Sequence, residues 1–564
     1  MKLTEYVYER PDVSNILGEM KRCINDINEA STIQEQEKSI NEFNKLVNHY
    51  QSLSTYSSIN YSKNTQNKNF QEENEFFNKN NPIVDAQIKE YYAAILNSKY
   101  KNELKEKFGN QLFNIASLTV KTNSDKIIDI KQQENNLTSE YIKLIASAKI
   151  EFEGTTTNLT GLAVYYKDLD RNKRLKAQQA KNDFFKSNQN QLNTIFDDLV
   201  KLRHQKAIKL GYKNYVAFGY DYMNRSDYNY KDVASYRDLV LKYIVPVCTK
   251  LREKQKERLE LDKLYFHDEP LLFKNGNPQP KGNPEWIVEQ ATEMYRQLSP
   301  ETYEFFEFMK SNDLLDLVNR EGKAGGGYCT YIPDLRSPFI FSNFNGTTHD
   351  IKVLTHEAGH AFQVYNSRDY TLPEYYFPTY EACEIHSMSM EFLTWPWMEL
   401  FFKEDLDKFK YEHLFSSLTF LPYGVAVDEF QHIIYEHPDM TPNERHAVWK
   451  SLEEKYLPHR IYKDVDYISN GGYWQGQAHI YKMPFYYIDY TLAQICAFQF
   501  FLKSINDRIG AWKDYLKLCK LGGSKSFLEL VNAAGLKSPF NEDTFKQIVV
   551  EIENELGKIE ENID

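Results

Sequence analysis

The sequence lacks any apolar run that approaches the roughly 20 residues a membrane-spanning helix requires. The stretch from Met1 to Met20 is charged and polar without a hydrophobic segment, so we expect no signal peptide. Basic residues are the minority charge, and the net charge of −12 disfavours nucleic acid or an anionic membrane as a partner. We therefore expect a protein with neither a nucleic-acid nor a membrane partner.

Cysteine is scarce, with 6 residues in 564 and no paired spacing. In a chain of this size, scattered cysteines are typical of buried thiols and not of a disulfide framework. The sequence also contains no repeat of fixed period, which argues against a solenoid or propeller. We therefore expect a cytoplasmic protein that folds around hydrophobic cores.

Aromatic residues are abundant, at 15% of the chain with 41 Tyr and 35 Phe. They supply material for a large core and for an aromatic-lined cleft. Helical periodicity predicts helices through residues 1–50, 83–260 and 510–564. The polar segment 51–82 allows two interpretations, disorder or a polar surface helix, and its recurring aromatic residues favour the helix. The Thr- and Gly-containing segment 151–164 predicts a turn between helices.

Two β-like runs, at residues 328–333 and 338–344, follow a glycine triplet and end at Asn345-Gly346. One interpretation is a structural hairpin with a glycine turn. The other is an edge strand, because such a strand can hydrogen-bond the backbone of an extended peptide. On the second interpretation, we expect a peptide to lie against residues 339–344.

The most informative stretch is residues 353–362, which contain the pattern His356-Glu357-x-x-His360. Residues four apart on a helix lie about 40° apart around its axis, so both imidazoles can reach one metal ion. Glu357 then lies close enough to move a proton on an attacking water molecule. The competing interpretation is a buried helix with two satisfied structural histidines. We expect Thr347 or Thr348 to cap this helix.

A second acidic helix follows at residues 380–391, where Glu381, Glu384 and Glu391 fall on one face. Buried carboxylates are usually paired or bound to a metal, and two histidines with one glutamate form an established zinc set. Glu384 or Glu381 could complete this set. A salt-bridged helix face is the alternative. The metzincin pattern is excluded because the residues three and six positions after His360 are Gln and Asn.

A third region, residues 471–502, combines a Gly-rich loop, His479 and an apolar helix predicted over 485–502 with Pro484 at its start. This helix carries Tyr486, Tyr487 and Tyr490. Buried phenol hydroxyls need partners, which either a catalytic cleft or ordinary core packing can supply.

These three regions resemble the thimet-oligopeptidase superfamily of zinc metallopeptidases, and most closely its oligoendopeptidase F branch, which includes the Pz-peptidases. The resemblance implies a mostly α fold, a bilobed helical ellipsoid similar to neurolysin, with a deep central channel and a small sheet beside the zinc helix. It implies one compact unit in which residues 1–200 form one wall of the channel and residues 201–564 form the catalytic part. The channel would admit short peptides and exclude folded proteins.

The resemblance also implies roles for individual residues. His356, His360 and Glu384 would bind one Zn²⁺ per chain, and Glu357 would act as general base. Glu381 would hold a ligand imidazole. His479 would stabilise the tetrahedral intermediate together with two of the tyrosines that follow it. Tyr486 and Tyr490 are the preferred pair, with Tyr481 and Tyr487 as rivals.

The sequence therefore predicts a zinc-dependent endopeptidase, of the gluzincin type, that cleaves internal bonds of short oligopeptides. We expect oligopeptides as its substrates and a monomer or small homo-oligomer as its assembly. A non-catalytic helical peptide-binding protein, with structural zinc or none, is one rival. It is disfavoured because structural zinc usually has four protein ligands, often cysteines. A zinc carboxypeptidase is a nearer rival.

Overall fold

The computed structural model describes residues 2–563, and within them the chain is mostly α-helical with small sheets, which confirms the predicted fold class. The N-terminal third contains α1 (Val13–Glu29), α2 (Ile33–Lys63), α3 (Lys68–Leu96), α4 (Lys101–Phe108), α5 (Gln111–Thr122), α6 (Ile128–Ala146), β1 (Ile150–Phe152), β2 (Thr155–Thr157), α7 (Leu159–Leu162) and α8 (Arg171–Ser187). The middle contains α9 (Gln189–Lys209), α10 (Tyr215–Tyr222), α11 (Tyr230–Leu239), α12 (Val245–Arg258), α13 (Pro284–Leu298), α14 (Pro300–Ser311), β3 (Leu315–Val318), β4 (Tyr328–Ile332) and β5 (Ser337–Phe344). The remainder contains α15 (Thr348–Ser367), α16 (Tyr380–Leu393), α17 (Glu399–Phe402), α18 (Leu406–Glu436), α19 (Pro442–Tyr456), α20 (Asp466–Ser469), α21 (Ala478–Lys482), α22 (Tyr487–Asn506), α23 (Arg508–Leu521), α24 (Phe527–Ala533) and α25 (Glu542–Glu560).

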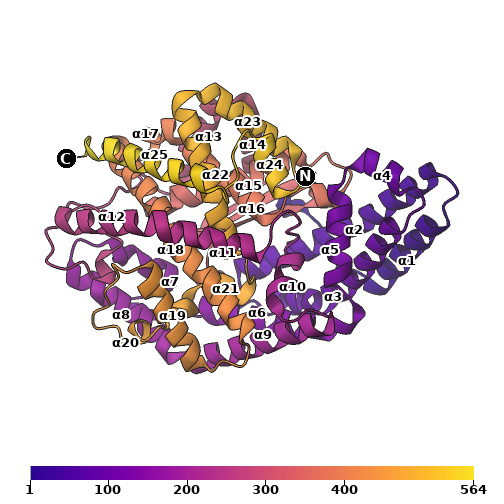
Figure 1. Ribbon diagram of the computed structural model, residues 1–564, viewed down its shortest axis with the longest axis horizontal. Coiled ribbons are helices and arrows are strands. Elements are labelled where there is room, and N and C mark those ends of the chain that lie inside the picture. Colours follow the sequence, from indigo (N-terminus) through magenta and orange to yellow (C-terminus); the bar gives the residue numbers. More distant parts are fainter. Residues whose placement is uncertain (1, 564) are drawn as a thin grey trace.

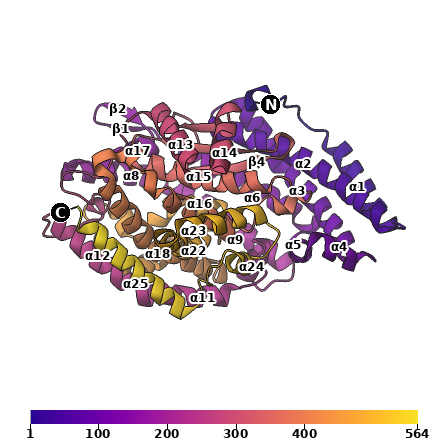
Figure 2. The same ribbon diagram turned by 90° about the horizontal axis from the view of Figure 1, so that it is seen from above.

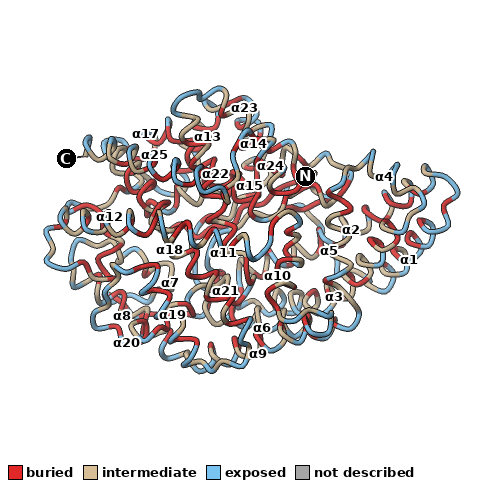
Figure 3. The backbone as a smooth tube through the Cα atoms, viewed as in Figure 1, coloured by how far each residue is buried: buried red, intermediate tan, exposed pale blue. Residues whose placement is uncertain are grey.

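The molecule is elongated, with α1 and α4 at one end and α12 and α25 at the other (Figures 1 and 2). Most residues of the central helices α15, α16 and α22 are buried, and the tube is largely red around the labels of α15 and α22 (Figure 3). The largest hydrophobic cluster joins most of the chain, whereas a second cluster holds α1 to α5 together. The central helices are therefore packed within the largest hydrophobic cluster, which suits them to carry a rigid site.

Several local predictions are tested by the helix bounds. The segment 51–82 is helical in α2 and α3 apart from a short break, which confirms the helical interpretation over disorder. The predicted turn over residues 151–164 takes the form of a short β1–β2 hairpin followed by α7. Glu153 and Gly154 both have positive φ at its tip, a combination that suits a tight hairpin turn. Across residues 2–563, no helix combines the length and apolarity needed to span a membrane.

The sheet beside α15 has the strand order β3-β5-β4, with β5 parallel to β3 and antiparallel to β4. Both predicted strands are present, but β3 was not predicted. Because β3 pairs with one edge of β5 and β4 pairs with the other, residues 339–344 lie in the central strand, and all of them are buried. The expectation that a peptide lies against residues 339–344 is therefore wrong, and the strand on the cavity side is β4.

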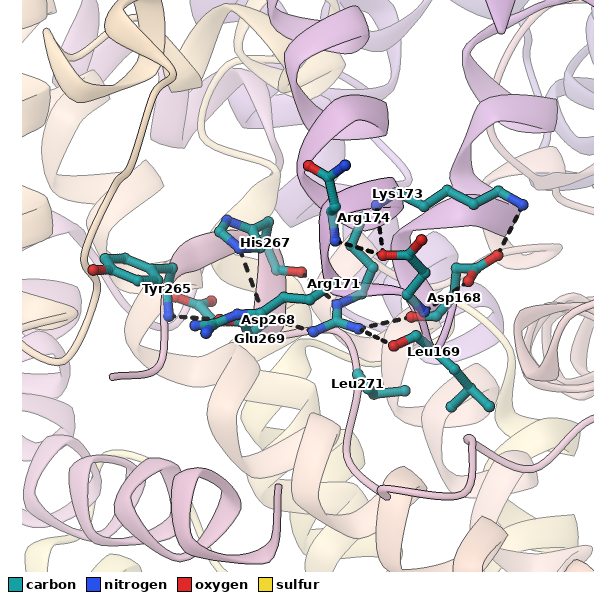
Figure 4. Close-up of polar contacts among 12 residues, drawn as sticks. Asp168, Leu169, Arg171, Lys173, Arg174, Tyr265, His267, Asp268, Glu269 and Leu271 are labelled. Atoms are coloured by element: carbon teal, nitrogen blue, oxygen red, sulfur yellow. Dashed lines mark hydrogen bonds and ion pairs between the residues drawn. The ribbon is translucent and has the colours of Figure 1, made fainter. Parts of the chain in front are cut away.

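The long connection between α12 and α13 is fastened to α8 by two ion pairs to the buried carboxylate of Asp268 (Figure 4). Arg174 Nη2 lies 2.6 Å from Asp268 Oδ1, and Arg171 Nη2 lies 2.7 Å from Asp268 Oδ2. Burial alone would raise the pKa of Asp268, but the two arginines hold it below its ordinary value. Arg174 also donates 2.8 Å to the carbonyl of Asp168. Removing one member of such a buried pair leaves an uncompensated charge, so the cluster stabilises this connection.

Candidate metal centre and active site

The helices α15 and α16 cross at unusually close range, and Gly359 permits this approach. A Cβ atom at Gly359 would lie 2.6 Å from the carbonyl oxygen of His386 and 2.7 Å from the Cα of Ser387. Any larger residue would push α16 away from α15. The close crossing brings side chains one turn apart on α15 against a side chain of α16.

Three candidate ligand atoms meet at this crossing. His356 Nε2 lies 3.2 Å and His360 Nε2 lies 3.3 Å from the same oxygen, Oε2 of Glu384. All three donor atoms lie within 4.8 Å of one another. Two imidazole nitrogens and one carboxylate oxygen form a donor set of the kind that catalytic zinc uses, so these residues fit a zinc ion.

Glu384 is fully buried, and its neighbours fix both of its oxygens. Ser387 Oγ donates 2.7 Å to Oε2, and the hydroxyl of Tyr486 donates to Oε1. Burial opposes ionisation, but His360 and His356 outweigh it and hold the pKa of Glu384 well below its ordinary value. Glu384 is therefore an ionised carboxylate whose oxygen faces both histidines.

A hydrogen-bonded chain from α18 fixes the tautomer of His356. Trp395 Nε1 donates 2.7 Å to Nδ1 of His413, so the proton of His413 is on Nε2, which donates 2.8 Å to Glu391 Oε2. The other oxygen of Glu391 accepts a hydrogen bond of 2.8 Å from Nδ1–H of His356. Nε2 of His356 therefore faces Glu384. Against the effect of burial, hydrogen bonds to Glu384 and Glu391 raise the pKa of His356 well above its ordinary value, so Nε2 gives up a proton when it binds a metal ion.

Glu391, and not Glu381, is thus the carboxylate that holds a candidate ligand imidazole. Neither carboxylate oxygen of the buried Glu381 has a hydrogen-bond partner among the described residues. The expectation that Glu381 holds an imidazole is therefore wrong. Against the effect of burial, hydrogen bonds from His356 and His413 lower the pKa of Glu391 to about 2, so Glu391 is ionised at neutral pH.

We expect Glu391→Gln to weaken zinc binding about 10–100-fold, the usual cost of removing a residue that orients a metal ligand. An amide can present its NH₂ to His356 and thereby favour the wrong tautomer. Competition with a chromophoric chelator measures the zinc affinity. The exposed Glu399 provides a matched Glu→Gln control, and equal zinc affinity in both variants would contradict the orienting role.

Glu357 projects beside the ligand cluster as a buried carboxylate. Its Oε2 has no hydrogen-bond partner within the described part of the chain. A Cβ atom added at Gly327 would lie 3.2 Å from Glu357 Oε1, so the glycine leaves this side of the carboxylate open. Burial raises the pKa of Glu357 above its ordinary value. A carboxylate of raised pKa with a free oxygen is suited to accept a proton.

A second chain of hydrogen bonds orients His479. Tyr423 donates 2.8 Å to Oε1 of Gln477, and Nε2 of Gln477 donates 2.8 Å to Nδ1 of His479. His479 Nε2 therefore carries the proton, and it lies 3.3 Å from the hydroxyl of Tyr490. Burial, reinforced by the charge of Lys482, lowers the pKa of His479 to about 4. His479 is thus a neutral imidazole with one N–H donor at neutral pH.

The structure separates the four candidate tyrosines into two pairs. Tyr486 and Tyr490 line the same cavity as the histidines. Tyr481 instead stacks on Tyr141 with ring centroids 4.1 Å apart, and Tyr487 packs edge-on against Tyr423. The expected helix start at Pro484 is wrong, because α22 begins at Tyr487, two residues after Phe485, which has positive φ.

The cavity that contains these groups has a volume of about 710 Å³. Side chains of α3 and α5 line one wall, including Ile88, Tyr92 and Ile115. The opposite wall is formed by α15, α16, α21 and the start of α22, and Tyr328–Thr330 of β4 lies between. The residues predicted to act on a substrate therefore line one cavity, to which side chains of α3 and α5 also contribute.

Thr347 is the N-cap residue of α15 but makes no side-chain capping bond. Asp350 accepts the backbone N–H groups of Asn345 and Gly346 at 3.0 Å and 2.8 Å. The expectation that a threonine hydroxyl caps this helix is therefore wrong, and a first-turn carboxylate orders the turn that precedes it. The arrangement joins β5 tightly to the helix that carries His356.

The chain matches two family models. The Peptidase M3 N-terminal domain matches residues 3–123, and Peptidase family M3 matches residues 164–550. The chain is also 24% identical to the oligoendopeptidase F homolog of Borreliella burgdorferi over 316 residues, which are 52% of this chain. That match spans about half of the relative, 50% of its length.

Solved structures extend the similarity to almost the whole chain. A structure described as Pz peptidase A with inhibitor 2 is 49% identical, with a TM-score of 0.98 and 99% of each chain covered. A putative oligoendopeptidase F is 50% identical, with the same TM-score and the same coverage. These similarities confirm the resemblance to the oligoendopeptidase F and Pz-peptidase branch.

Proposed function

Because this chain belongs to peptidase family M3, we propose that it is a zinc-dependent endopeptidase that hydrolyses internal bonds of short oligopeptides inside the cavity. The observation that supports this proposal most directly is the meeting of two imidazoles and one carboxylate beside Glu357. We propose His356, His360 and Glu384 as the residues that hold one zinc ion. When bound there, zinc supplies Lewis-acid chemistry that activates water and polarises the scissile carbonyl.

Glu357 is proposed as the general base that takes a proton from the attacking water and later gives it to the leaving amine. Its unpaired oxygen and raised pKa support this role. His479 and the pair Tyr486 and Tyr490 are proposed to donate hydrogen bonds to the developing oxyanion. For this step the hydroxyl of Tyr486 turns from Glu384 Oε1 to the oxyanion. Such a donor typically contributes about 2.7–4 kcal/mol when it is aimed at the transition state.

We propose that the substrate peptide lies in extended form beside β4. This strand is at the edge of its sheet, and residues Tyr328–Thr330 line the cavity. An edge strand can bind the backbone of a peptide without regard to its sequence. Gly327 keeps the space between this strand and Glu357 open.

The position of the site in a cavity between the N-terminal helices and the zinc helices supports selection by size. Residues of the proposed wall 1–200, such as Tyr92 and Ile115, face the catalytic side chains across the cavity. A folded protein cannot reach side chains inside a space of this size, whereas an extended peptide can. We also propose a cytoplasmic protein, since free and mostly buried thiols are typical of reducing compartments. We propose that it acts as a monomer or small homo-oligomer on peptides, with neither nucleic acid nor membrane as a partner.

The test is mass spectrometry of peptides from about 5 to about 40 residues after incubation with zinc-loaded protein, since an enclosed site favours the short ones. We expect internal cuts that are confined to short peptides and are lost with a chelator. Products shortened one residue at a time from the C-terminus would favour a carboxypeptidase instead. Absence of any cleavage would favour a peptide-binding protein.

A further inference from the structure

The start of α22, which carries both cavity-lining tyrosines, is fastened by one buried arginine. Arg225 Nη2 donates 2.6 Å to the carbonyl oxygen of Phe485 and lies 2.6 Å from Asp489 Oδ1. The side chains of Arg225 and Asp489 are both fully buried. The arginine thus holds the residue before Tyr486 and the residue before Tyr490.

The backbone at Phe485 needs such a restraint. Phe485 has a φ of 66°, a left-handed conformation that is unfavourable for a bulky residue. Its N–H donates 2.9 Å to Oε1 of Gln431 on α18, and its ring presses on Gly219, where a Cβ atom would lie 2.6 Å from the ring. Three separate elements therefore impose the conformation that aims Tyr486.

The segment that carries this arginine also reaches the cavity. Arg225 directly follows Met223 and Asn224, and both of these line the cavity. Asn224 has a φ of 58°, so this segment turns sharply between the cavity wall and the buried guanidinium. The arginine thus connects a wall of the cavity to the start of α22, where Tyr486 precedes the helix and Tyr490 lies in its first turn.

We propose that Arg225 is a positioning residue for Tyr486. Arg225 fixes the phenol of Tyr486 through its bonds to Phe485 and Asp489 and does not touch the substrate. The inference rests on the proposed peptidase function. The Nη2 group suits this position because its two N–H donors reach the Phe485 carbonyl and the Asp489 carboxylate at the same time. A displacement of about 1 Å in a group aimed at the transition state can cost about 100-fold in rate.

The experiment is a double-mutant cycle with Arg225→Met and Tyr486→Phe, which separates positioning from general destabilisation. We expect Tyr486→Phe to lower kcat about 100-fold and Arg225→Met to lower it about 10–100-fold, with KM changed much less. The double variant is expected to be no slower than Tyr486→Phe alone, because the positioned hydroxyl is already missing. Because the hydroxyl of Tyr486 also donates to Glu384 Oε1, kcat is compared at saturating zinc, where each variant should hold one ion per chain.

Arg174→Met is the matched control, because it also removes a buried arginine from an ion pair but none of the residues in that cluster lines the cavity. We expect it to lower the melting temperature and to leave kcat unchanged. If Arg225→Met does not fold, Asp489→Asn retains the side-chain shape, and the same cycle is run with it. We then expect about a 10-fold loss that disappears in the Tyr486→Phe background.

Losses that multiply in the double variant, or a kcat of Arg225→Met equal to wild type, would overturn the inference while leaving the proposed function intact. Wild-type protein that cleaves no peptide would overturn the proposed function and this inference together. A shared loss in the cycle, with normal zinc content, would establish Arg225 as a positioning residue.

Discussion

Replacing Glu357 with glutamine is expected to lower kcat by about 10²–10⁴-fold, the usual contribution of a positioned general base. The amide has nearly the shape of the carboxylate but accepts no proton from the attacking water. Glu357 lies beside the candidate zinc ligands and makes no hydrogen bond to His356, His360 or Glu384, so zinc content should be unchanged. Steady-state kinetics on a short peptide, together with metal analysis, checks both expectations.

Glu374→Gln is the matched control. Glu374 lines the same cavity, but its carboxylate accepts a hydrogen bond from Tyr92 and is not part of the ligand cluster. We expect its kcat to stay near that of wild type. Full activity in Glu357→Gln with bound zinc would show that another group takes the proton.

The pH profile gives a second readout for Glu357. The base must be ionised to accept a proton, so activity is low below its pKa and rises as pH increases through it. Burial raises that pKa, so the acid limb of kcat/KM should lie above the ordinary range of a glutamate. His479, whose pKa is about 4, is already neutral across neutral pH and does not account for a limb there. An acid limb at the ordinary range of glutamate would show that the positive charge of bound zinc offsets the effect of burial.

The local part of the candidate site was predictable because helix geometry alone determines it. His356, Glu357 and His360 lie within one turn and a half of α15, so their relation follows from the residue spacing. The third ligand was not determined in this way, since Glu381 and Glu384 lie one turn apart on the same face of α16. The resemblance to the family favoured Glu384, and the crossing at Gly359 places its oxygen 3.2 Å and 3.3 Å from the two imidazoles.

The groups that orient the site could not be predicted, because their partners are remote in the sequence. His413 is 22 residues from Glu391, and Tyr423 is 54 residues from Gln477. No spacing rule connects residues on different helices, although the position of Glu391 two turns after Glu384 was a partial signal. The mistaken role of residues 339–344 has a similar origin, because it depends on β3, a short parallel strand with weak alternation.

Removing the carboxylate of Glu384 is expected to weaken zinc binding by more than about 100-fold, beyond the cost of losing a residue that only orients a ligand. In Glu384→Gln a neutral amide replaces the anion between two imidazoles, and one of its orientations points an NH₂ group at both Nε2 atoms. We expect peptidase activity to fall with zinc occupancy and to return only partly at high zinc concentration. Chelator competition measures the affinity. The rise in melting temperature on adding zinc, which reflects binding to the folded state, should shrink in the variant.

Glu381→Gln is the matched control for Glu384→Gln. It makes the same chemical change one turn earlier on α16, where the carboxylate has no hydrogen-bond partner among the described residues. Zinc affinity should be unchanged there, because Glu381 reaches neither imidazole. Tight zinc binding by Glu384→Gln would show that another donor completes the set, and a loss confined to Glu381→Gln would move the ligand by one helical turn. The pair of variants thus tests the one ligand that helix spacing alone did not determine.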